Sequence, residues 1–182
     1  MKVPSIGPFF TFRFCDLVSA GLCRRFSFFI FATLSSMTRG EFEKLVEEEF
    51  PKAVPEKFHA LIQNLAFIVE DEPSKDVRAA EHLGEDETLL GYYRGIPHTA
   101  RGDNYGVGPT LPDTIVLYRL PIEDEAEHLQ HTDKLEYVGM SYEEAVRKVV
   151  RETIWHEVAH FFGMDEHQVR RREDERDGNE TR

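Results

Sequence analysis

Residues 141–167 read SYEEAVRKVVRETIWHEVAHFFGMDEH, and they carry the strongest helix signal in the chain. Ser141, followed three residues later by Glu144, forms a capping box, a pattern that begins many helices. Apolar residues then recur at helical spacing, and Gly163 is typical of the position just after a helix end. The sequence therefore predicts one long helix over residues 142–162.

The last turns of this predicted helix hold the sequence HEVAH. His156 and His160 are four residues apart, so both project from one helix face and can bind a single cation at about 2.0–2.1 Å from each ring nitrogen. Toward the N-terminus the same face consists of residues suited to the core: Thr153, Val149, Val146 and Tyr142. Glu157 lies about 100° round the helix from His156, where it can flank an activated water without binding the metal. The pattern indicates a divalent metal site with one free carboxylate.

A zinc site of this kind needs a third protein ligand. A turn at Gly163 would bring the next residues back toward the histidine face. The spacing HExxHxxGxxE places Glu166 where the extended zinc-binding pattern has its third histidine, so Glu166 is the preferred ligand. Asp165 and His167 stay open as alternatives, because one residue of difference in the turn would exchange them. A glutamate from the polar tail (Glu173, Glu175 or Glu180) is disfavoured, because apolar residues that could fix it are lacking there.

Composition restricts the classes of partner. The chain has 182 residues, 41% hydrophobic and 31% charged, which fits one ordinary packed domain. A net charge of -12 leaves no basic surface for phosphate backbones, so nucleic acid is not an expected partner. The apolar run Phe26–Leu34 is far shorter than the roughly 18–20 residues that span a bilayer. Cys15 and Cys23 fit no disulfide framework or zinc-ribbon spacing.

Charge and composition both change near Met37. Residues 1–36 contain four Lys and Arg but one Asp, and they hold eight of the 14 Phe. We expect them to be an apolar, basic extension outside the fold, either translated upstream sequence with Met37 as the natural start or a targeting segment. The folded domain is then expected over residues 37–169, followed by a charged, disordered tail at 170–182. A cytoplasmic location follows if Met37 is the start, and export through residues 1–36 is the alternative.

The remaining elements are shorter. Thr38 and Glu41 form a second capping box, so a helix is expected over residues 39–50, ended by Pro51 and then Pro55. A short helix near residues 58–65 and three strands are expected to follow, the strands at residues 66–69, 89–96 and 114–120. A Gly- and Pro-rich loop over 102–113 joins the last two strands, and the acidic stretch 123–136 is expected to be a solvated helix or loop. This order of elements predicts an α+β fold.

Four stretches of the chain also carry a resemblance to a known family: NLAFIVEDEP at 64–73, LLGYYRGIP at 89–97, LPDTIVLYRLPI at 111–122 and HEVAHFFG at 156–163. Together they resemble the small bacterial zincin-like metallopeptidases, whose short domain ends soon after an HExxHxxGxxD motif. The chain departs from that motif at Glu166, which replaces the aspartate. The resemblance implies a minimal zincin-like fold, with a small mixed sheet packed on an N-terminal helix and a long C-terminal active-site helix. It also implies that the strand at 114–120 is an edge for an extended substrate.

The resulting functional prediction is a zinc-dependent metallopeptidase that acts on peptide or protein substrates. His156, His160 and Glu166 would bind one Zn²⁺, with one position open for water. Glu157 would act as general base toward that water and then deliver the proton to the leaving amine. The alternative is a catalytically silent, zincin-shaped module that binds metal or regulates a partner protein.

Overall fold

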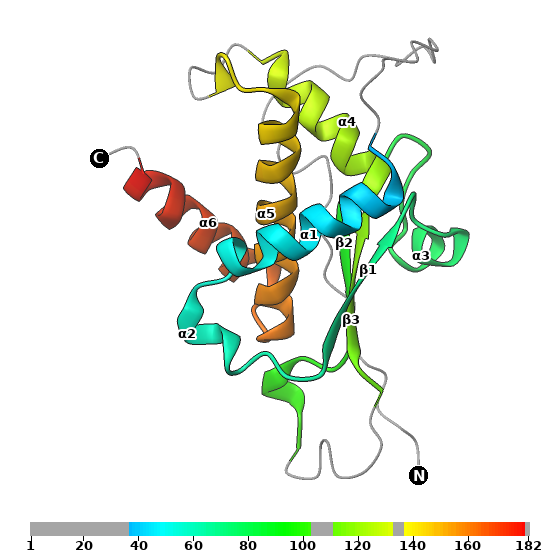
Figure 1. Ribbon diagram of the computed structural model, residues 1–182. Coiled ribbons are helices and arrows are strands. Elements are labelled where there is room, and N and C mark those ends of the chain that lie inside the picture. The colour runs from blue at the N-terminus through cyan, green and yellow to red at the C-terminus, as the bar shows by residue number, and fades with distance from the viewer. Residues whose placement is uncertain (1–36, 103–110, 133–136, 181–182) are drawn as a thin grey trace.

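The computed structural model describes residues 37–102, 111–132 and 137–180 (Figure 1). The helices are α1 (Arg39–Ala53), α2 (Glu56–His59), α3 (Lys75–Ala80), the 3-10 turn η2 (His98–Ala100), α4 (Arg119–Gln130), α5 (Tyr142–Phe161) and α6 (Glu166–Glu180). The strands are β1 (Leu65–Glu70), β2 (Gly91–Arg94) and β3 (Asp113–Tyr118). The α+β prediction is therefore confirmed. The extension at 1–36, most of the predicted loop at 102–113 and residues 181–182 lie outside the described residues.

The three strands form one mixed sheet in the order β1-β3-β2. β3 pairs with β1 in parallel and with β2 in antiparallel orientation. The expectation that the strand at 114–120 is an edge is therefore wrong, because β3 has a hydrogen-bonded neighbour on both sides. β2 is the sheet edge that lies against α5.

The two faces of the sheet are buried in two different clusters. Ile115 and Leu117 of β3 point into the main core, together with apolar residues of α1, α4 and α5. Val116 and Tyr118 point to the other face, where Val77 of α3 covers them. Figure 1 accordingly shows α5 and α3 on opposite sides of the sheet. The alternation follows from the two-residue period of a strand.

The capping box at Thr38 and Glu41 is formed, but α1 is longer than expected. Pro51 lies inside its last turn and does not end it. A proline removes one hydrogen bond to the carbonyl four residues earlier, and here that carbonyl belongs to the solvent-exposed Glu47. The helix ends at Ala53, just before Val54 and Pro55.

The chain leaves the sheet earlier than expected and turns into α4. β3 ends at Tyr118, and Pro121 occupies the first turn of the helix, where its missing N–H costs no hydrogen bond. The acidic stretch is not solvated all round: Glu123 and Glu125 are buried on a helix that packs along α5, and Arg119 pairs with Glu123 at 3.1 Å. A charge-rich sequence is thus compatible with a packed helix when its acids are paired or lie beside the core.

In place of the disordered tail expected over residues 170–182, α6 continues from Glu166 to Glu180. Asp165 and Gln168 explain its start: the Gln168 N–H donates to Asp165 Oδ1 at 2.9 Å, and the Asp165 N–H donates to Gln168 Oε1 at 3.0 Å. Val169 is fully buried and anchors the first turn to the body of the protein. Among the described residues, no helix is both long and apolar enough to cross a membrane.

Candidate metal centre

The end of α5 is fixed by its own backbone. The Gly163 N–H donates to the His160 carbonyl at 2.9 Å, and the Met164 N–H donates to the Ala159 carbonyl at 3.1 Å. This pair of bonds is a Schellman motif, which requires a left-handed residue, and Gly163 has φ +86. The predicted turn is confirmed, and it brings α6 back toward the last turn of α5 (Figure 1).

The two histidines converge as their spacing predicts. His156 Nε2 and His160 Nε2 are 3.1 Å apart, on fully and almost fully buried side chains. The opposite ring nitrogens have other partners: His160 Nδ1 lies 3.0 Å from the Met164 carbonyl, and His156 Nδ1 lies 3.1 Å from Glu173 Oε1. Each ring therefore presents Nε2 to the same point in space.

Glu166 contributes the third atom of the group. Its Oε2 lies 3.4 Å from His156 Nε2 and 3.7 Å from His160 Nε2, while its Oε1 accepts a bond from Arg170. The other two residues considered for this position lie elsewhere: Asp165 caps α6, and His167 is exposed. Of the three neighbours in the turn, Glu166 is the one that the structure brings to the histidines.

The three donor atoms fit a metal ion. They all lie within 4.8 Å of one another. Two ligands held at 2.0–2.1 Å in a tetrahedron are about 3.4 Å apart, close to the distances between these atoms. Glu166 Oε2 is buried and has no hydrogen-bond partner among the described residues. A buried oxygen of this kind is costly unless something compensates it, and a bound cation would do so.

Charge in the group also favours a cation. Burial raises the pKa of Glu166, but His156 and Arg170 outweigh this and lower it to about 2, so the carboxylate stays ionised. Burial and the charge of His156 hold the pKa of His160 below its usual range, which favours the neutral imidazole that metals bind. Burial opposes protonation of His156, but Glu166 and Glu173 outweigh it and raise its pKa to about 9, so a proton on this imidazole takes the place that a cation would occupy.

Glu157 lies beside this group of three converging residues. Its side chain is fully buried, and neither carboxylate oxygen has a hydrogen-bond partner among the described residues. Burial raises the pKa of Glu157 to about 7, against the opposing effect of His156. The edge strand β2 passes very close: a Cβ added at Gly91 would lie 2.9 Å from Glu157 Cγ and 2.7 Å from Thr153 Cγ2. Glycine at position 91 is what lets β2 approach α5 here.

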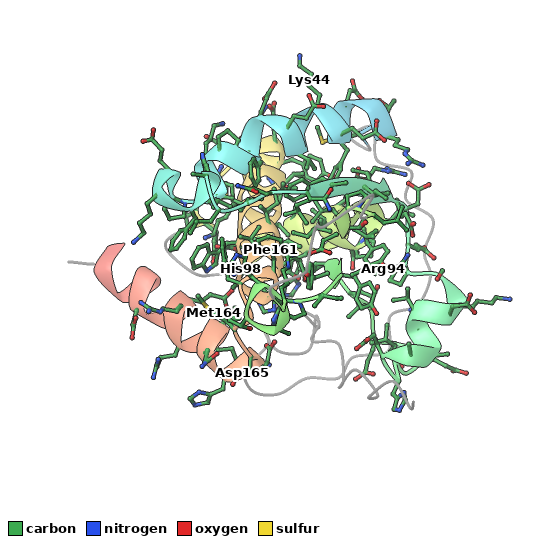
Figure 2. The ribbon with its side chains drawn as sticks, turned by 90° about the horizontal axis from the view of Figure 1, so that it is seen from below. Lys44, Arg94, His98, Phe161, Met164 and Asp165 are labelled. Atoms are coloured by element: carbon green, nitrogen blue, oxygen red, sulfur yellow. The ribbon has the colours of Figure 1, made fainter. Side chains whose placement is uncertain are left out.

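A second network supports the end of α5 from the sheet side. Tyr93 donates its hydroxyl to Asp113 Oδ2 at 2.9 Å, and Arg101 forms an ion pair with the same carboxylate. The Arg101 guanidinium lies 4.7 Å from the centre of the Phe161 ring. Figure 2, seen from below, shows His98 beside Phe161 at this end of the helix, with Met164 and Asp165 at the turn into α6. These contacts connect β2 and β3 to the end of α5 that carries His160.

The sequence did not predict the position of Glu173, which was disfavoured as a residue of an unstructured tail. It lies on α6, two turns after Glu166, and contacts Nδ1 of His156. A signal was present: Asp165-x-x-Gln168 matches a capping box, which would have indicated a helix starting at 166.

Comparison with known proteins gives a family match. The family model described as zincin-like metallopeptidase matches residues 62–176, well over half of the chain. The matched region starts after α1 and α2 and continues past Val169 into α6, so it includes both converging histidines and Glu166. A comparison with curated proteins found no match. The chain belongs to the zincin-like metallopeptidase family.

Proposed function

We propose that this protein is a zinc-dependent metallopeptidase and that His156, His160 and Glu166 bind its single Zn²⁺. The observation that carries the proposal is the convergence of two imidazole Nε2 atoms and one buried carboxylate oxygen at the end of α5. Two histidines and a glutamate, with a fourth position left for water, form a ligand set of catalytic rather than structural zinc sites.

The roles of the chain's own residues follow from their positions. Zinc, when bound, would supply a Lewis acid that activates water and polarises the substrate carbonyl. Glu157 would accept the proton of the attacking water and donate it to the leaving amine of the peptide. A general base works best when its pKa lies near the working pH, and burial raises the pKa of Glu157 to about 7. The substrate class is peptides or proteins.

Glu157→Gln tests the catalytic part of the proposal. The amide has the same shape but cannot accept the proton, so peptide hydrolysis should fall by at least about 10²–10⁴-fold. Zinc content should stay at one ion per chain, because Glu157 is not among the converging ligands. The measurement is cleavage of a peptide library, with zinc determined on the same samples by elemental analysis.

Glu143→Gln is the matched control, because it makes the same substitution on the exposed first turn of α5. It should leave both hydrolysis and zinc content unchanged. Equal hydrolysis by wild type and Glu157→Gln would contradict the assigned role of Glu157. Zinc-loaded wild type that cleaves no peptide in the library would favour the silent metal-binding module instead.

A further inference from the structure

Helix α6 presents two acids to the histidine pair from one face. Glu166 and Glu173 are seven residues apart, about two helical turns, so their side chains point the same way. Val169 lies between them on that face and is fully buried. The contact of Glu173 with His156 is thus part of the surface by which α6 packs, rather than a stray contact of an exposed residue.

The contact is made on the far side of the imidazole. Glu173 Oε1 lies 3.1 Å from His156 Nδ1, whereas Glu166 and His160 face Nε2. The two nitrogens lie on opposite edges of the ring, so Glu173 cannot share an ion with Nε2. A carboxylate beside Nδ1 accepts the N–H of the tautomer whose free lone pair is on Nε2.

The two histidines are oriented by different acceptors. The carbonyl of Met164 accepts from His160 Nδ1, and this contact belongs to the backbone of the turn. His156 is oriented by a charged side chain, with an exposed fraction of 21% for Glu173 and 0% for the histidine. A carboxylate in this place makes the imidazole a stronger electron donor as well as fixing its direction.

We propose that Glu173 is a positioning residue that holds His156 in the Nδ1–H tautomer and aims its Nε2 at the zinc position. The inference rests on the proposed zinc site, and it assigns to α6 a function beyond supplying Glu166. Helix α6 is polar, and its only apolar residue is Val169. The contacts that complete the site would then also hold this helix in place.

Zinc affinity measures the contribution of Glu173 without any substrate. We expect Glu173→Ala to raise the Kd for Zn²⁺ by about 10–100-fold in a competition titration against a chromophoric chelator. Glu173→Gln should give an intermediate loss, since its amide oxygen still accepts the Nδ1–H but carries no charge. Glu175→Ala is the matched control on α6, because Glu175 is exposed and pairs only with Arg171 and Arg172 among the described contacts.

A spectroscopic signature separates positioning from a structural effect on the helix. In zinc-loaded protein labelled with ¹⁵N-histidine, His156 should show a protonated Nδ1 whose N–H exchanges slowly with solvent. Glu173→Ala should speed that exchange and shift the Nδ1–H resonance, while His160 keeps its signals. Circular dichroism of each variant checks that the helical content is unchanged.

The outcomes are distinguishable. A Kd for Glu173→Ala within twofold of wild type, or an unchanged His156 Nδ1–H signal, would overturn the role of Glu173 and leave the zinc site intact. A wild-type protein that binds no zinc would overturn both this inference and the proposed function. Equal losses in Glu173→Ala and Glu175→Ala would assign the effect to α6 as a whole and also overturn the inference.

Discussion

Among Asp165, Glu166 and His167, only the middle side chain is directed at the histidines, and this gives a direct test of the ligand set. Glu166→Ala should weaken zinc binding by more than about 100-fold. This loss exceeds the one expected for Glu173→Ala, because Glu173 contacts a ligand and would not bind the ion itself. His167→Ala should bind zinc as wild type does, because His167 is exposed. The measurement is the zinc Kd of both variants. A larger loss in His167→Ala than in Glu166→Ala would transfer the ligand role to the histidine.

Gly163 determines where α6 begins. Alanine there must adopt φ +86, and its Cβ would collide with the Thr99 side chain. We expect Gly163→Ala to lower the free energy of unfolding by roughly 1–3 kcal/mol and to weaken zinc binding through displacement of Glu166. Chemical denaturation measures the first effect and a zinc titration the second. Gly102→Ala is the control, since a Cβ at Gly102 meets nothing within 4 Å.

The sequence was sufficient for side chains whose positions follow from helical geometry alone. His156, Glu157 and His160 lie within two turns of one capped helix, so their relative directions are set by the helix period. Glu166 needed one further assumption, a turn at Gly163, which the glycine supplies. Glu173 could not be placed in the same way, because its position depends on how α6 packs on α5.

Helix α1 is joined to α5 by a buried acid with three basic partners. Glu49 is fully buried and lies 2.7 Å from nitrogens of both Arg147 and Arg151 and 2.8 Å from Lys52 Nζ. Burial opposes ionisation, but these three cations outweigh it and lower the pKa of Glu49 to about 2. The folded pKa is thus below the usual value of 4.5, so the pairing stabilises the fold above about pH 4.5.

Glu49→Gln should therefore lower the free energy of unfolding at pH 7 by about 1–3 kcal/mol. The difference from wild type should shrink as the pH falls from about 4.5 toward 2, because wild-type Glu49 is then protonated too. Urea denaturation at several pH values measures it, with Glu47→Gln as control at a solvent-exposed position of the same helix. A difference that stays constant or grows toward acid pH would contradict the assigned ion cluster.

Capping boxes and burial explain which elements the sequence predicted. α5 combines a capping box with a long apolar stripe, so its expected and observed bounds differ by one residue. α6 has a capping box but a single apolar residue, so composition alone indicated disorder. The central position of β3 depends on pairing with segments far apart in the chain, which periodicity within one segment does not report.

For the molecule as a whole, the proposed zinc site would join helices α5 and α6. His156 and His160 come from α5 and Glu166 from α6, so an ion bound to all three favours the folded state by mass action. Zinc at 100 times its Kd should add about 2.7 kcal/mol to the stability, and a chelator should remove this gain. Thermal melts with and without zinc measure it. His156→Ala should show no zinc-dependent shift in Tm, and a shift equal to that of wild type would contradict the site.

The most direct measurement is X-ray absorption at the zinc edge of the loaded full-length protein, together with its zinc content. We expect one zinc per chain, with two imidazole nitrogens at about 2.0–2.1 Å and oxygen ligands completing a four-coordinate shell. Removing His160 should leave one imidazole in the shell. A spectrum of the wild type without two imidazoles, or a zinc content unaffected in the double variant His156→Ala and His160→Ala, would contradict the proposal that these two rings bind one ion.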